Sequence, residues 1–105
     1  MVNEKYDNAA IFKALGDGTR LRIFAMLSES ELCACHILEE FHITQPTLSY
    51  HMKVLTDCGL VRGVRDGAWM KYTLNPAALC SVRKLFELCE DQSAGPQARS
   101  KERLS

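Results

Sequence analysis

The apolar periodicity of the chain changes at Gly59, and this change limits the folds that the chain can adopt. Before Gly59, apolar residues recur at spacings of three and four, which predicts amphipathic helices. From residue 60 to residue 74 the chain alternates around Asp66-Gly67, a dipeptide well suited to a two-residue hairpin turn. The sequence therefore predicts a mainly α fold with one small β-hairpin.

Four helices are expected before the hairpin and one after it. The first covers about residues 6–15 and ends at Gly16, and the second follows Asp17 and Thr19, which are candidate caps. Apolar residues surround most of the second helix, which predicts deep burial. The third spans about 33–41, the fourth about 45–58, and the last runs from Pro76 to about residue 90. Thr44 or Gln45 is expected to cap the fourth helix.

Length and composition indicate one domain. The 105 residues are 47% hydrophobic, which suffices for one core, and we place the domain at residues 1–91. Residues 92–105 are rich in Ser, Gln and charged side chains, so this tail is expected to be disordered.

The charge balance and the cysteine count limit the possible partners and the cellular compartment of the protein. Thirteen basic residues balance thirteen acidic ones, so any affinity for DNA must come from local clustering. The chain has no bilayer-length apolar run and begins with a polar segment, so we expect a cytoplasmic protein without a membrane partner. Five cysteines, an odd number, are typical of a reducing compartment in which thiols stay free.

The fourth predicted helix has the features of a DNA-reading helix. Leu48, Met52 and Leu55 share one face and should point inward. The remaining candidates for DNA contact are Gln45, Thr47, Ser49, Tyr50, His51 and Lys53. Amide and hydroxyl groups can read base edges, and lysine can contact phosphate or guanine. A solvated polar face is the alternative, but an exposed tyrosine and the scarcity of carboxylates favour DNA.

The hairpin carries further candidates for DNA contact. With Asp66-Gly67 as the turn, Arg62 lies opposite Lys71, an unfavourable pair unless an anion lies between them. Arg65 adds a third positive charge, so we expect the hairpin to bind the DNA backbone. The alternatives are splayed, solvated basic side chains or a longer loop that breaks this register.

Cys33 and Cys35 are the candidate ligands for a thiophilic ion. Helical residues two apart project about 200° from each other, so shared coordination requires a non-helical start to the third helix. His36 is a possible third ligand, and a small-molecule thiol or water is another. Cys58 lies at the far end of the fourth helix. Cys80 and Cys89 should point in opposite directions on the last helix, as core or interface residues.

The order of helices and hairpin is that of a winged helix-turn-helix, and four segments carry a resemblance to a known family. They are Leu15–Ile23 before and within the second helix, Glu31–Cys35, Thr44–Met52, and Gly67–Tyr72 in the hairpin. The chain resembles the ArsR/SmtB family of metal-responsive repressors. This resemblance implies a homodimer that represses transcription at double-stranded operator DNA and is released when As(III) or Sb(III) binds Cys33 and Cys35.

Departures from the family pattern leave alternatives open. The arsenite-type pattern has a third cysteine where this chain has Leu38. The amino terminus lacks the cysteine of the cadmium and lead sensors, and the last helix lacks the Asp/His/Glu pattern of the zinc sensors. A cadmium, lead or zinc sensor stays an alternative, as does a redox regulator that senses oxidants through Cys33 and Cys35. We expect no enzyme and no catalytic cofactor, because His51 and Cys58 lack an orienting third group and a pocket.

Overall fold

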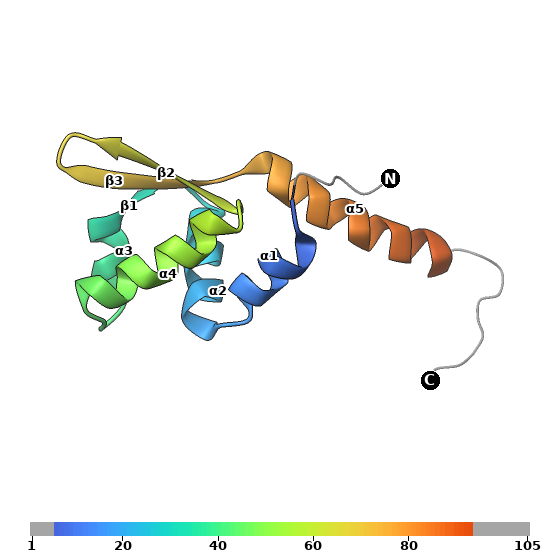
Figure 1. Ribbon diagram of the computed structural model, residues 1–105, viewed down its shortest axis with the longest axis horizontal. Coiled ribbons are helices and arrows are strands. Elements are labelled where there is room, and N and C mark those ends of the chain that lie inside the picture. The colour runs from blue at the N-terminus through green and yellow to red at the C-terminus, as the bar shows by residue number, and fades with distance from the viewer. Residues whose placement is uncertain (1–5, 94–105) are drawn as a thin grey trace.

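The computed structural model describes residues 6–93, which form a helical body with a β-hairpin along one side (Figure 1). The elements are α1 (Asn8–Leu15), α2 (Gly18–Leu27), β1 (Leu32–Cys33), α3 (Ala34–Glu40), α4 (Gln45–Asp57), β2 (Val61–Asp66), β3 (Trp69–Leu74) and α5 (Pro76–Ser93). The predicted mainly α fold with a hairpin is confirmed. Helix α5 runs two residues into the segment predicted to be a tail, and the rest of that segment lies outside the described residues.

Side-chain caps define where three of the helices begin. Asp7 accepts hydrogen bonds from the amides of Ala9 and Ala10 at 3.0 and 3.4 Å. Asp17 accepts one from the amide of Arg20 at 3.1 Å, and this bond is the main reason why the pKa of Asp17 lies below its ordinary value. The predicted caps are thus confirmed for α2 and, through Thr44, for α4.

The core lies where the helices meet the hairpin. Its largest fully buried side chains are Ile11, Ile23, Ile37, Leu55 and Leu60. Leu48, Met52 and Leu55 are all buried, so the predicted inward face of α4 is confirmed. This packing holds α4 in one rotational setting and leaves its opposite side open.

Deep burial of α2 was a wrong prediction. Only Ile23 and Leu27 of this helix are buried, and Leu21 is 51% exposed. An apolar circumference shows which sides a helix could bury, but neighbouring elements decide which sides are covered. In α2 they cover one side.

The sheet contains one strand that the periodicity did not reveal. The order is β1-β3-β2, all antiparallel, and β1 consists of two residues. Leu32 pairs with Tyr72 and Cys33 pairs with Lys71. The backbone just before α3 is therefore hydrogen-bonded to strand β3 of the hairpin β2–β3. We call this hairpin the wing.

The register of the wing corrects a second prediction. Asp66 pairs with Trp69, so the turn is Gly67-Ala68 and not Asp66-Gly67. Gly67 has φ of 63°, the left-handed conformation that hairpin turns require at their first central position. As a result Lys71 lies opposite Val64, and the expected like-charged pair of Arg62 and Lys71 does not form.

Candidate DNA interface and thiol site

The open side of α4 carries the predicted reading residues. Gln45, Thr47, Ser49 and Lys53 are exposed, and Tyr50 is 61% exposed. Lys53 forms an exposed ion pair with Asp57, whose carboxylate lies 3.1 Å away at the far end of the helix. The amide and hydroxyl groups nearer the start of α4 therefore face solvent without a neighbouring carboxylate on the helix.

His51 lies at the edge of this face, and its ring contacts Arg20 of α2. The guanidinium of Arg20 lies 3.0 Å from Nδ1 of His51, and its Nε donates to the carbonyl of Ala14 at 2.6 Å. Arg20 thereby connects the end of α1 to the middle of α4. DNA contact by His51 stays a prediction, with only Nε2 of the ring available for it.

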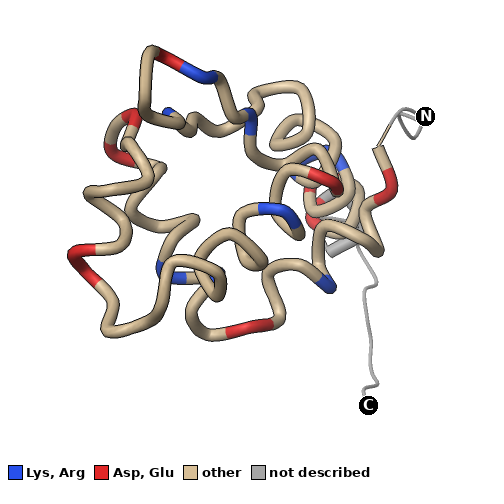
Figure 2. Tube along the Cα trace, turned by 60° about the vertical axis from the view of Figure 1, so that its left-hand side comes forward, with Lys and Arg blue, Asp and Glu red and all other residues tan. Residues whose placement is uncertain are grey.

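The wing carries three basic residues, Arg62, Arg65 and Lys71, and one acidic residue, Asp66, and basic and acidic positions are both spread over the rest of the fold (Figure 2). Nζ of Lys71 lies 3.0 Å from a carboxylate oxygen of Asp66, and this contact raises the pKa of Lys71 above its ordinary value. Arg62 and Arg65 are exposed, and neither forms an ion pair with a residue from 6 to 90. Of the three wing residues predicted to contact the DNA backbone, the two arginines therefore have no ion-pair partner among these residues.

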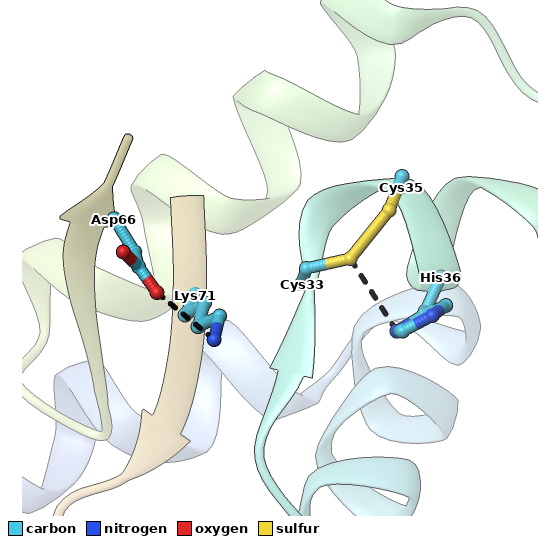
Figure 3. The surroundings of a disulfide bond; sticks show 5 residues. All are labelled: Cys33, Cys35, His36, Asp66 and Lys71. Atoms are coloured by element: carbon cyan, nitrogen blue, oxygen red, sulfur yellow. Dashed lines mark hydrogen bonds and ion pairs between the residues drawn. A yellow bond between two sulfur atoms is a disulfide. The ribbon is translucent and has the colours of Figure 1, made fainter. Parts of the chain in front are cut away.

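Cys33 and Cys35 come together because the backbone is not helical at Cys33. Cys33 ends β1 with φ of −85° and ψ of 159°, whereas Cys35 belongs to the first turn of α3. Their Cα atoms lie 5.4 Å apart and their sulfur atoms are joined as a disulfide (Figure 3). The need for a non-helical start is confirmed, and the expectation of free thiols is corrected for this pair.

His36 completes the only group of three candidate metal-ligand side chains in the described part of the chain. Its Nδ1 lies 3.3 Å from the sulfur of Cys33, and the donor atoms of Cys33, Cys35 and His36 all lie within 4.8 Å of one another. The three other cysteines lie outside this group. Cys58 and Cys80 are half-buried, and Cys89 is exposed.

A pocket of about 550 Å³ lies beside the thiol site, between α3, α4 and the wing. Cys35 and Leu38 contribute from α3, Gln45 and Ser49 from α4, and Arg65 from the wing. Apolar walls come from Ala34, Leu48, Met52, Ala68, Trp69, Met70 and Tyr72. One cavity is thus lined both by a candidate metal ligand and by candidate DNA contacts.

Known proteins are similar to this chain in sequence and in fold. The family model described as "Bacterial regulatory protein, arsR family" matches residues 17–62. An arsenical resistance operon repressor of Staphylococcus aureus is 51% identical over 74 residues, which cover 70% of this chain and 71% of the relative. The chain belongs to the ArsR family.

Two further comparisons cover more of the fold of this ArsR-family chain. An uncharacterized HTH-type transcriptional regulator of Methanocaldococcus jannaschii, MJ1325, is 40% identical over 86 residues, covering 80% of this chain and 97% of the relative. The crystal structure of a possible transcriptional regulator for arsenical resistance matches with a TM-score of 0.66 and 30% identity, covering 72% of this chain and 79% of that chain. The family and these relatives are transcriptional regulators and not enzymes.

The ArsR-family match extends from the cap of α2 to the second residue of β2, so it contains the thiol site and all of α4. Three functional features were missed from the sequence: the pairing of Cys33 with Lys71, the contact of Arg20 with His51, and the pocket. Each joins segments far apart in the chain. No helix within residues 6–93 is both long and apolar enough to cross a membrane.

Proposed function

We propose that this ArsR-family repressor binds operator DNA through α4 and the wing, and that As(III) or Sb(III) releases it by binding Cys33 and Cys35. The observation that carries the proposal is the position of the two thiols on the short strand β1 and the first turn of α3. This position adjoins the reading helix in sequence and the wing through the β-ladder. The name of the Staphylococcus aureus relative supports arsenic as the inducer.

In this proposal α4 recognises the bases and the wing contacts the DNA backbone. Gln45 and Ser49 read bases in the major groove, and Thr47, Tyr50, His51 and Lys53 flank them. Arg62, Arg65 and Lys71 contact phosphates through the wing. The unpaired state of both arginines supports this division, because a cation without an internal partner is available to a phosphate.

Release follows from the backbone shape that the ion requires. Binding a soft trivalent ion requires the reduced, deprotonated thiols to stand at distances set by the ion. Because Cys33 is bonded through its backbone to β3, any shift of Cys33 is transmitted to the wing. A coupling of about 1.4 kcal/mol is sufficient for a tenfold loss of DNA affinity.

Among the residues that the structure describes, His36 is the nearest third donor. Its Nδ1 already lies beside the sulfur of Cys33. In the absence of another sulfur donor, we assign the third position on the ion to this nitrogen.

We also propose a two-fold homodimer formed through α1 and α5. Helix α5 extends away from the rest of the body (Figure 1), and Phe86 and Leu88 on it are 53% and 56% exposed. Phe12 of α1, 41% exposed, meets Phe86 edge-on with ring centres 5.9 Å apart. Such an apolar surface suits a self-complementary interface, and two reading helices about 34 Å apart would address an inverted repeat. Sedimentation showing a monomer at micromolar concentration, bound singly to each operator, would remove this part.

The test of the switch compares cysteine variants of the reduced protein on operator DNA. Cys33→Ser and Cys35→Ser should keep operator affinity and lose release by arsenite. Serine favours the cap position that Cys33 occupies, so the first variant should not weaken α3. Cys80→Ser and Cys89→Ser are the matched controls and should release normally. Release of the Cys33→Ser variant by arsenite would refute the assigned site.

The disulfide favours a second function, redox sensing by the same pair. Peroxide would take two electrons and two protons from Cys33 and Cys35, forming the S–S bond and two molecules of water. The oxidised pair has no thiolate to offer a metalloid. Titration of the DNA complex with peroxide separates the two functions: release by peroxide but not by arsenite would make the oxidant the signal.

A further inference from the structure

We propose that a small thiol carrying a carboxylate supplies the third sulfur donor to arsenic, and that this molecule lies in the pocket between α3, α4 and the wing. The inference rests on arsenic binding at Cys33 and Cys35, as proposed above. It adds a ligand that the protein binds together with the metalloid.

The first argument is the shortage of sulfur at the site. Trivalent arsenic replaces three oxygen ligands and favours soft thiolates over imidazole nitrogen. The described chain brings only two thiols together here, with His36 as the third member of the group. One turn after Cys35, where a further donor would share its side of the helix, stands Leu38. An external thiol would therefore displace His36 from the third position.

The second argument is the location of the pocket. Cys35 and Leu38 both line it, so space is open beside one of the two cysteines and beside the residue that provides no donor. Its volume of about 550 Å³ falls within the range of about 300–1,000 Å³ that is typical of small-molecule sites. A molecule of the size of a short peptide could occupy it while its sulfur binds arsenic.

The third argument is the chemistry of the walls. Leu38, Trp69 and Met70 offer apolar contact to a carbon skeleton. Arg65 lines the same space and has no ion pair with any residue from 6 to 90, so its guanidinium is available to a carboxylate. A purely hydrocarbon ligand would leave this cation without a partner.

The reaction needs no oxidant or reductant once the protein thiols are reduced. Arsenite, As(OH)3, exchanges its three As–O bonds for As–S bonds to Cys33, Cys35 and the small thiol. Each leaving hydroxide takes the proton of one thiol, so three molecules of water are formed and arsenic stays trivalent.

The bound thiol would also act on DNA directly. Gln45, Ser49 and Arg65 line the pocket and are the same side chains that we propose for DNA contact. A molecule held by them cannot coexist with the same contacts to bases and phosphates. The acidic thiol should therefore increase release by arsenite beyond what the ion achieves alone.

The experiment uses the full chain, reduced with a phosphine and free of DNA. Arsenite is added with equimolar N-acetylcysteine or with its uncharged amide, and native mass spectrometry counts arsenic and thiol per subunit. We expect a complex of one arsenic and one N-acetylcysteine, formed at least about threefold more tightly than with the amide, a difference of about 0.65 kcal/mol. Arg65→Gln should abolish the preference for the acid. Arg62→Gln, a wing arginine outside the pocket, should keep it.

Two further variants complete the test. Leu38→Cys should bind arsenic without added thiol as tightly as the unchanged protein binds it with N-acetylcysteine, and His36→Ala should bind it weakly alone but normally with N-acetylcysteine. Equal binding of acid and amide, or loss of the preference in Arg62→Gln as well as Arg65→Gln, would overturn the proposal while leaving the metalloid switch intact. Absence of arsenic from Cys33 and Cys35 in every arm would overturn both.

Discussion

Helices α3 and α4 are neighbours in sequence, yet they are held to very different degrees. Helix α4 has 13 residues, a capping side chain at Thr44, a proline in its first turn and three buried anchors. Helix α3 has 7 residues, no side-chain cap at Cys33, and a single buried residue, Ile37.

The difference corresponds to two tasks. A reading helix must present side chains in a fixed register, so firm anchoring improves its selectivity. A sensing segment must change shape for a small free-energy cost, and short helices with few anchors are the least costly to distort. In the proposed function, the ion acts on the weakly held start of α3, and the firmly held α4 and the wing respond.

The largest expected effect is on the free energy of unfolding and concerns the apolar side chains that hold α4 and α3 in place. Leu55 is fully buried, so Leu55→Ala should lower the free energy of unfolding by about 2–5 kcal/mol through lost packing and a cavity. Leu38 of α3 is only half-buried, and Leu38→Ala should cost clearly less. Urea unfolding of both variants tests this difference. Equal losses would mean that α3 is anchored as firmly as α4.

The next effect separates base recognition by α4 from contact of the wing with the DNA backbone. Gln45→Ala and Ser49→Ala should each weaken operator binding by about 1–3 kcal/mol while affecting random DNA much less. Arg62→Ala should weaken both and reduce the salt dependence by about one unit. Lys71→Ala should show a smaller change, because Asp66 already pairs with this lysine. Binding titrations over a range of salt concentrations on both DNAs measure this, and identical losses for all variants would argue against base reading by α4.

A smaller effect compares the two helix starts directly. Thr44→Ala removes the bond to the amide of Thr47 and should cost about 1 kcal/mol of stability. Cys33→Ala removes no cap bond, so in the reduced protein it should cost much less. Thermal unfolding under reducing conditions gives both values. A larger loss for Cys33→Ala would show that its side chain supports α3 in a way that the cap position does not explain.

The smallest effect concerns the wing tip, where Asp66 forms an ion pair with Lys71. Asp66→Asn should free Lys71, lower its raised pKa toward the ordinary value and leave it charged at neutral pH. Binding to random DNA should then strengthen and its salt dependence steepen by up to about one unit. The native ion pair should be fully present at neutral pH and be lost as pH rises through the raised pKa of Lys71. Unchanged DNA binding of Asp66→Asn would exclude Lys71 from the interface.

The sequence alone predicted the features that depend on neighbours along the chain. Caps at Asp17 and Thr44, the inward face of α4 and the end of that helix near Gly59 are encoded within one or two helical turns. The requirement for a non-helical backbone at Cys33 follows from helix geometry alone, and the structure meets it. The exposed polar face of α4 was predictable for the same reason.

Only the tertiary structure decided the features that join distant segments. A turn displaced by one residue gave every position of the wing a new partner and removed the expected pairing of Arg62 with Lys71. The exposure of Leu21 depended on which elements cover α2. The pairing of β1 with β3 and the pocket beside Cys35 require elements about 35 residues apart to meet, and no local pattern encodes that distance.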